Sequence, residues 1–214
     1  MNSFNSIATN HGSINLPAFM PDATYGSIKA VSFQDAKNAG VKEIVTTTLH
    51  IEQKVGSDFI KEYGGIHKFL NWDRPILSDS GGWQVFSLVN SKSKISSPTF
   101  CGTSLKSENR ISEAGCSFIN QNTGEQTLLT PENSIQIQHN LNTDILTVLD
   151  FPILGSSSLS ERKKCVEINS KWAKRCKKKF EEFQLNEVRN NIKPLLGAVI
   201  QGGDDFELRK RSAE

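Results

Sequence analysis

The chain has 214 residues, 36% of them hydrophobic and 22% charged, which is ordinary for a globular protein with a sizeable core. Its net charge is only +2, from 25 basic and 23 acidic residues, so any affinity for nucleic acid must come from a local patch. Residues 1–15 lack the basic and apolar regions of a signal peptide, and no apolar run approaches the ~20 residues that span a bilayer.

The four cysteines form no Cys-x-x-Cys pair and have no histidine at a ligand spacing. We therefore predict reduced thiols, with neither a disulfide nor a metal site, for Cys101, Cys116, Cys165 and Cys176. Reduced thiols without a membrane span predict a cytoplasmic protein with no membrane partner.

Predicted helices and strands alternate along the first part of the chain. Residues 32–40 predict a helix that is capped by Ser32. The β-branched residues 43–48 predict a strand. A second helix is predicted over residues 57–63, before a glycine pair, and the apolar residues 75–78 predict a buried strand.

The middle of the chain contains a loop, a hairpin and a further helix and strand. Residues 91–106 are rich in Ser, Lys and Thr, which indicates an exposed loop. Residues 110–129 predict a hairpin that turns at residues 122–124. A threonine, a proline and an acid open a predicted helix over residues 130–141, and residues 144–149 predict the next strand.

The last third begins with a capping box, formed by Ser158 and Glu161, that opens a long helix. One face of this helix is apolar and consists of Cys165, Ile168, Trp172, Cys176, Phe180 and Phe183. Residues 194–200 predict the last strand. The alternation predicts βα units with a mostly parallel sheet. We find no repeat or linker and expect one domain over residues 1–214. Because the chain ends inside a predicted helix, we expect it to be shortened.

The most informative segment is DSGGWQ, residues 79–84, directly after a predicted strand. Its carboxylate suits an acid or a base, and its glycines let the backbone approach a ligand closely. Trp83 can stack on a ring, and Gln84 offers a donor and an acceptor in one group. This combination suits a flat ligand with hydrogen-bonding edges.

Polar residues follow other predicted strands in the same way. Asp79, Asp150 and Gln201 each end a strand, and His50 follows another less closely. The carboxyl ends of strands converge on one face of a (β/α) barrel or an open α/β sheet. We therefore expect the two acids and the amide to form hydrogen bonds with the edge of a purine-like base. The alternative is that each acid only caps the next helix, but three such residues on one face favour a binding site.

Together these segments resemble the tRNA-guanine transglycosylases, also called queuine tRNA-ribosyltransferases. The similar segments follow the family's order and are LPAFMP at 16–21, GGIHKFLNWDRPIL at 64–77, DSGGWQVFSL at 79–88, LTPE at 129–132, Leu149-Asp150 with Pro152, and Gln201-Gly202-Gly203 before Leu208-Arg209 and RSAE at 211–214. Each segment alone is weak evidence for the resemblance, but the whole series in the family's order is specific for it.

The resemblance implies an α/β fold of the TIM (β/α)8 type, incomplete here because the family's C-terminal strands and zinc subdomain are absent. It implies exchange of a guanine in tRNA for a 7-deazaguanine (queuine, preQ1 or preQ0), as in queuosine modification. An aspartate attacks the ribose C1′ to give a covalent intermediate that the incoming base displaces, as in retaining glycosidases. The implied partners are tRNA, the guanine or deazaguanine base and, in full-length members, a second subunit in a homodimer or heterodimer.

The resemblance also assigns roles to individual residues. Asp79 is the implied catalytic acid/base carboxylate, and Trp83 replaces the usual stacking phenylalanine. Asp150 and Gln201 are implied to read the edge of a base that has left its stack. The implied substrate-binding residues are Asp79, Ser80, Gly81, Gly82, Trp83, Gln84, Asp150, Gln201 and Gly202.

Two features depart from the family's pattern. The nucleophilic aspartate and the zinc-binding Cys/His cluster belong to a part of the family beyond Glu214, so we expect no cofactor in this chain and no complete transglycosylation by it alone. Asp204 and Asp205 are predicted to cap a helix instead. Phe151 replaces a second acid of the common bacterial pattern, which leaves open which deazaguanine fits.

Two other functions stay open. A non-catalytic accessory paralogue could pair with a complete partner, and a DNA-directed relative could insert deazaguanines into DNA. The sequence downstream of Glu214 would discriminate a shortened enzyme from an accessory protein.

Several further residues receive structural interpretations. Basic residues between 162 and 179 suit either a phosphate-binding surface or, as we favour, the solvated face of an outer helix. His67 and His139 have no acidic or cysteine partner in their helical patterns, so we predict structural roles. We predict that His11 lies in a mobile terminus and that Trp72 is a packing residue.

Overall fold

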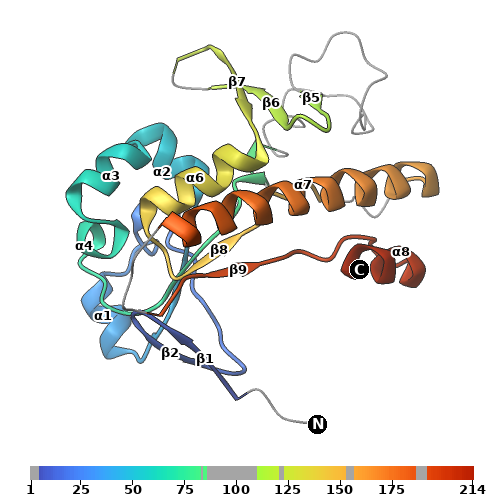
Figure 1. Ribbon diagram of the computed structural model, residues 1–214. Helices are drawn as coiled ribbons and strands as arrows, with labels where there is room; N and C mark the ends of the chain where they lie inside the picture. The colour runs from blue at the N-terminus through green and yellow to red at the C-terminus, as the bar shows by residue number, and fades with distance from the viewer. Residues whose placement is uncertain (1–4, 83, 86–109, 121–122, 153–156, 187–191) are drawn as a thin grey trace.

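The computed structural model describes residues 5–82, 84–85, 110–120, 123–152, 157–186 and 192–214 (Figure 1). Its centre is a parallel sheet with the strand order β3-β4-β8-β9. The four strands are β3 (Ile44–Thr46), β4 (Ile76–Ser78), β8 (Ile145–Thr147) and β9 (Leu195–Gly197). Asp22 forms a parallel bridge with Val45, so a further extended segment borders β3. The predicted parallel α/β architecture is therefore confirmed.

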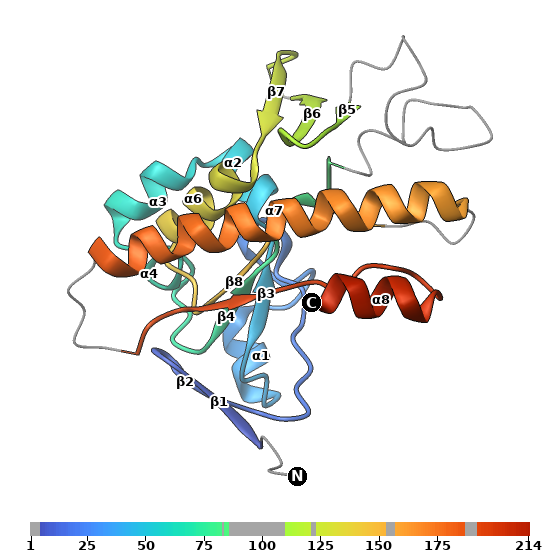
Figure 2. The ribbon, with the colours of Figure 1, turned by 45° about the vertical axis from the view of Figure 1, so that its right-hand side comes forward.

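Helices connect and cover the strands of this sheet. Figure 2 shows α6 and α7 lying side by side along the sheet, and α8 following β9. The helices are α1 (Phe33–Asn38), α2 (Thr48–Lys54), α3 (Ser57–Tyr63), α4 (Ile66–Leu70), α6 (Pro131–Leu141), α7 (Leu159–Asn186) and α8 (Phe206–Ala213), with a 3-10 turn, η1 (Thr24–Gly26). Within the described residues, every helix is too short or too polar to cross a bilayer.

The predicted helix starts have the hydrogen bonds that their sequences require. The Ser32 hydroxyl accepts from the backbone N–H of Asp35, and the Thr130 hydroxyl accepts from that of Asn133. Ser158 and Glu161 bond reciprocally, at 2.7 and 3.3 Å, as a capping box. Local side-chain chemistry thus sets where three of the helices begin.

Two predicted elements differ from the structure. The strand predicted over residues 43–48 is only three residues long, because Thr48 already begins α2. The predicted hairpin over residues 110–129 is a three-stranded antiparallel ribbon of β5 (Arg110–Ile111), β6 (Cys116–Ile119) and β7 (Gln126–Leu129). The loop predicted over residues 91–106 lies outside the described residues.

The N-terminal segment is also structured, which the sequence analysis missed. β1 (Ser6–Thr9) and β2 (Gly12–Asn15) form an antiparallel hairpin, and Figures 1 and 2 place it at the opposite end of the sheet from the β5–β7 ribbon. The prediction that His11 lies in a mobile terminus is therefore wrong, because His11 belongs to the turn of this hairpin.

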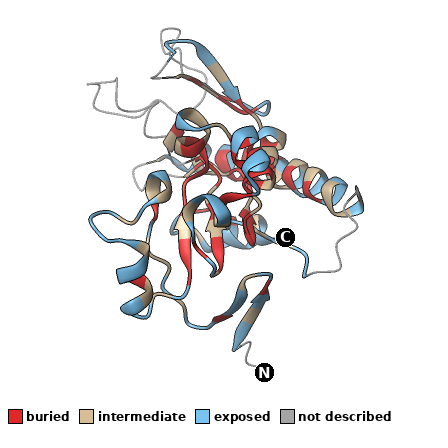
Figure 3. Cartoon of the chain, turned by 90° about the vertical axis from the view of Figure 1, so that its left-hand side faces the viewer, coloured by how far each residue is buried: buried red, intermediate tan, exposed pale blue. Residues whose placement is uncertain are grey.

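The core has two parts, and Figure 3 shows buried residues on the strands and on the sides of the helices that face them. The larger part packs the predicted apolar face of α7 against β8 and the β5–β7 ribbon. Trp172 and Cys176 lie at its centre and are fully buried. The smaller part surrounds Trp72, which confirms Trp72 as a packing residue. These two clusters fix α7 and the strand ends on which the candidate site is built.

Candidate functional site

Asp79 lies directly after β4, at the carboxyl end of the parallel sheet. Its Oδ1 accepts hydrogen bonds from the backbone N–H groups of Thr48, at 2.8 Å, and Gly81, at 3.1 Å. Its Oδ2 accepts a bond of 2.6 Å from the side-chain amide of Gln84. Donors from two successive βα units therefore hold this carboxylate in one orientation.

Asp150 lies after β8 and joins two of the other predicted residues. Its Oδ1 accepts from the Ser80 hydroxyl at 2.9 Å, and its Oδ2 accepts from the Gln201 amide at 3.0 Å. The backbone N–H of Gln201 donates to the hydroxyl of Ser212 on α8, so this helix positions the amide. Residues that follow β4, β8 and β9 thus meet in one hydrogen-bonded group, as the strand topology predicts.

Two of the predicted glycines allow close backbone approaches. A Cβ at Gly82 would lie 2.0 Å from the Asp150 carbonyl oxygen, so only glycine lets the segment after β4 pass this close to the end of β8. A Cβ at Gly202 would lie 2.6 Å from the backbone nitrogen of Arg209, where the chain turns into α8 with a φ of +126°. Gly81 also has a positive φ, of +80°.

The two carboxyl groups share a buried, polar environment. Burial raises the pKa of Asp79 above its usual value of 3.8, against the lowering effect of its hydrogen bonds from Thr48, Gln84 and Gly81. Burial also raises the pKa of Asp150; its bond from Ser80 opposes this, and the charge of Asp79 adds to it. A proton is therefore retained in this group to a higher pH than on an exposed aspartate, as proton transfer requires.

Sequence reasoning missed the residues that support this group from α6. The Ser134 hydroxyl donates to the Ser80 carbonyl at 2.7 Å. Gln138 accepts from the Ser78 hydroxyl, at 2.8 Å, and from the backbone of Thr147, at 2.7 Å, so it bridges β4 and β8. Both side chains are fully buried. The sequence signal that could have found Ser134 and Gln138 is their spacing, because residues four apart lie on the same face of a predicted helix.

Other predicted residues have different positions. Trp83 lies outside the described residues. His50 lies on α2 and packs its ring against Tyr25. Phe151, which stands where the common bacterial pattern has a second acid, packs into the larger core. Asp205 caps α8 by accepting from the backbone N–H of Leu208, as predicted. The same prediction for Asp204 is wrong, because Asp204 pairs with Arg162.

The basic residues of α7 mostly have acidic neighbours. Arg175 forms a two-pronged bond with Glu132, at 2.7 and 2.6 Å, and Lys171 pairs with Glu113. Further along the helix, two lysine–glutamate pairs occur at helical spacing, Lys177 with Glu181 and Lys179 with Glu182. This pairing supports the interpretation of a solvated outer face.

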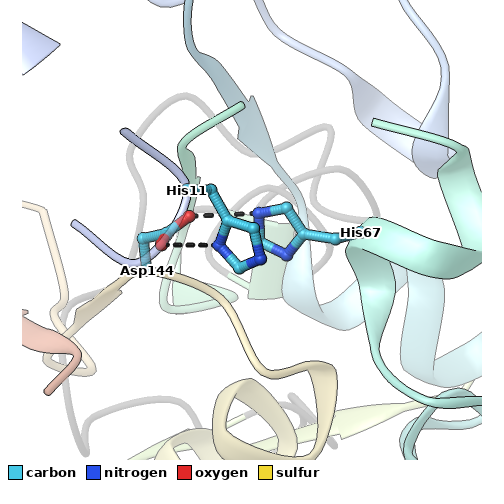
Figure 4. Close-up of side chains that lie close together, drawn as sticks. All are labelled: His11, His67 and Asp144. Carbon is cyan, nitrogen blue, oxygen red and sulfur yellow. Dashed lines mark hydrogen bonds and ion pairs between the residues drawn. The ribbon is translucent and has the colours of Figure 1, made fainter. Parts of the chain in front are cut away.

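The structure corrects one interpretation of the histidines. His67 was predicted to have no acidic partner, but its Nε2 lies 3.1 Å from Oδ2 of Asp144 (Figure 4). The partner lies directly before β8, 77 residues away, so a local sequence pattern could not reveal it. His139, in contrast, stacks on Phe183 with 3.9 Å between the ring centroids, which fits a packing role.

The described cysteines agree with the prediction of reduced thiols. Cys116, Cys165 and Cys176 are free and buried. Burial raises the pKa of each of these thiols to about 12, so they stay protonated. Cys101 lies outside the described residues.

Comparison with known proteins gives the family. The family model described as queuine tRNA-ribosyltransferase matches residues 4–214. Proteins named queuine tRNA-ribosyltransferase from Shouchella clausii and Neisseria meningitidis are 37% and 35% identical to this chain, each over 207 residues and 97% of it. The aligned region is 48% and 49% of these two relatives, so the chain spans about half their length. The chain belongs to the queuine tRNA-ribosyltransferase family.

Proposed function

We propose that this chain forms the base-binding part of a tRNA-guanine transglycosylase, a pentosyltransferase that exchanges guanine in tRNA for a 7-deazaguanine. The observation that carries this proposal is the joining of Ser80, Asp150 and Gln201 into one hydrogen-bonded group beside Asp79. Family membership supports the reaction type, and the relatives' name supports tRNA as the partner.

In this proposal Asp150 and Gln201 read the hydrogen-bonding edge of the base. The Asp150 carboxylate accepts from the ring N–H and the exocyclic amino group of guanine, in place of its present donors Ser80 and Gln201. Gln201 then turns its amide to the neighbouring polar atoms of the base. Trp83 stacks on the face of the ring.

Asp79 moves the proton in this proposal. Its raised pKa supports a carboxyl group that gives a proton to the departing base and takes one from the incoming base. Gln84 and the two backbone donors hold it in place during both steps. The base leaves the RNA stack to reach it.

We further propose that residues 1–214 belong to a (β/α)8 barrel. Support comes from the strand order β3-β4-β8-β9, in which each neighbour is parallel and follows in chain order, and from the Asp22 bridge beside β3. The nucleophilic aspartate and a dimer interface are proposed to involve the half of the relatives that this chain does not align with. The family's zinc site is also proposed to lie in that half, because the one metal-ligating group among the described residues contains no cysteine.

Equilibrium binding of guanine to this chain tests the proposal. We expect saturable binding that Asp150→Asn weakens by about 10–100-fold, since hydrogen bonds to charged groups contribute roughly 1.5–3 kcal/mol. The control is Asp204→Asn, which removes an exposed carboxylate after β9 and should leave binding unchanged. Absence of guanine binding, or equal effects of the two variants, would contradict the proposal.

A further inference from the structure

A second polar cluster lies at the opposite, amino-terminal end of the sheet. His11 in the β1–β2 turn, His67 on α4 and Asp144 directly before β8 converge there (Figure 4). His11 Nδ1 lies 2.8 Å from Asp144 Oδ1, and His67 Nε2 lies 3.1 Å from Asp144 Oδ2. The two imidazole rings are stacked, with 3.5 Å between their centroids.

We propose that these three side chains form a structural binding site for a divalent cation of the zinc type. One ligand atom from each residue lies within 4.8 Å of the other two. Two imidazole nitrogens and a carboxylate oxygen are a ligand set that Zn²⁺ accepts in tetrahedral geometry, with water in the fourth position. The cation replaces the protons that now lie between the rings and the carboxylate.

Asp144 is buried and held in one orientation by a backbone hydrogen bond, which suits a metal ligand. Its side chain is almost completely buried, and its Oδ2 accepts a bond of 2.9 Å from the backbone N–H of Ile76. This bond holds the carboxylate through Oδ2, and Oδ1, which now accepts from His11 Nδ1, is the oxygen that would ligate the cation. A backbone donor behind a ligating carboxylate is the usual outer-shell support of a metal ligand.

Each histidine presents a nitrogen lone pair to the ion by giving up its hydrogen bond to Asp144. Binding requires a neutral imidazole, whose single proton moves to the nitrogen that faces away from the metal. In His67 that atom is Nδ1, which is buried and has no hydrogen-bond partner among the described residues. When Nε2 binds the ion, the proton moves to Nδ1, and the cost of this unpaired buried donor is part of the measured affinity.

A cavity beside the cluster provides the open coordination position. His11 and His67 line it together with Lys37 and Lys68, and its volume is about 310 Å³. Both lysines have partners elsewhere: Lys37 pairs with Asp73 at 2.6 Å, and Lys68 lies over the Tyr63 ring. Water in this cavity can supply the fourth ligand.

The position of the cluster assigns it a structural role. It lies away from Asp79 and Asp150, which follow the carboxyl ends of the strands, and the amino-terminal end of such sheets serves stability. A bound ion would tie three distant segments together: the N-terminal hairpin, α4 and β8. Because the folded chain alone presents these ligands together, the ion should stabilise it in proportion to its affinity.

Zinc titration of the metal-free 214-residue chain by calorimetry tests this site. We expect one ion per chain and a higher unfolding temperature with zinc than with a chelator. His11→Gln and His67→Gln should each weaken binding by at least about 10-fold, because loss of even an outer-shell partner costs that much. His50→Gln is the matched control, which removes a histidine outside the cluster and should change nothing.

Cobalt substitution identifies the ligands directly. Nitrogen and oxygen ligands give only weak d–d absorption, whereas thiolates add intense charge-transfer bands. The proposed nitrogen and oxygen ligands predict only weak d–d absorption, and thiolate charge-transfer bands would overturn the proposal. Binding that His11→Gln leaves unchanged, or no saturable zinc binding by a chain with native circular dichroism, would overturn it as well.

Discussion

The side-chain amide of Gln201 donates a hydrogen bond of 3.0 Å to Asp150, so the carboxyl ends of β9 and β8 meet in one polar contact. The same carboxylate accepts from Ser80, which follows β4. Three neighbouring parallel strands therefore contribute to one group, and the proposed base recognition depends on this convergence.

Gln201→Ala removes one of the two donors to Asp150. We expect a loss of about 1 kcal/mol in the free energy of unfolding, because a buried acceptor loses its partner, and weaker guanine binding. Chemical denaturation and equilibrium binding measure the two effects. Gln184→Ala is the control, since Gln184 lies in the last turn of α7 and donates to the backbone carbonyl of Pro194. Equal effects of both variants on guanine binding would contradict a role of Gln201 in recognition.

Asp79→Asn should change how stability depends on pH. Because burial raises the folded-state pKa of Asp79 above 3.8, ionisation makes the wild-type chain lose stability as pH rises from 3.8 through that pKa. The variant lacks this loss, so its stability relative to wild type should increase from pH 3 toward pH 7. An asparagine amide can also donate to Gln84 Oε1, which is buried and without a partner among the described residues.

Urea unfolding of both chains at several pH values measures this difference. Asp204→Asn provides a comparison, because the bond from Arg162 lowers the pKa of Asp204 and the group is exposed, so the increase should not occur there. A relative stability of Asp79→Asn that falls with rising pH would contradict the prediction.

Gly82→Ala should disturb the closest approach in the site. The added Cβ would lie 2.0 Å from the Asp150 carbonyl oxygen, so the ends of β4 and β8 must separate. We expect a destabilisation of about 1–3 kcal/mol, as for other overpacked sites, and loss of guanine binding. Gly197→Ala is the control, because the added Cβ would lie 3.6 Å from the carbonyl oxygen of Leu146, and it should be tolerated. Similar unfolding midpoints for Gly82→Ala and wild type would contradict the geometry.

Glu132→Gln should remove an acid-sensitive contribution to stability. The bond from Arg175 holds the pKa of Glu132 below its usual 4.5. The pair therefore stabilises the fold above pH 4.5, and this contribution is lost as pH falls through the lowered pKa. Both side chains are more than a third exposed, so we expect only about 0.5–1 kcal/mol at neutral pH.

The control for this pair is Glu181→Gln, which breaks a longer and more exposed contact with Lys177. It should cost less than Glu132→Gln at pH 7, and neither variant should differ from wild type in acid. A cost of Glu132→Gln that persists at low pH would indicate lost packing instead of a lost ion pair.

Much of the fold follows from local signals in the sequence. The caps at Ser32, Thr130 and Ser158 and the apolar face of α7 depend on residues within a few turns of one another, and all are confirmed. The convergence of Asp79, Asp150 and Gln201 followed from one topological rule, that parallel strands end on a common face. Their roles toward a base remain proposals.

Contacts between distant segments could not be predicted in the same way. His11 and Asp144 are 133 residues apart, and no periodicity relates a hairpin turn to the start of a buried strand. The Gln138 bridge was missed because a polar residue on the inward face of a helix breaks the apolar pattern that defines that face. The N-terminal hairpin is short and polar, so its strands give little alternation.

Base discrimination tests the central proposal most directly. Hypoxanthine is guanine without the exocyclic amino group, so a carboxylate that reads this group should favour guanine. We predict that the wild-type chain binds guanine about 10–100-fold more tightly than hypoxanthine and that Asp150→Asn binds the two bases nearly equally. An undiminished preference for guanine in Asp150→Asn would show that Asp150 does not contact the base.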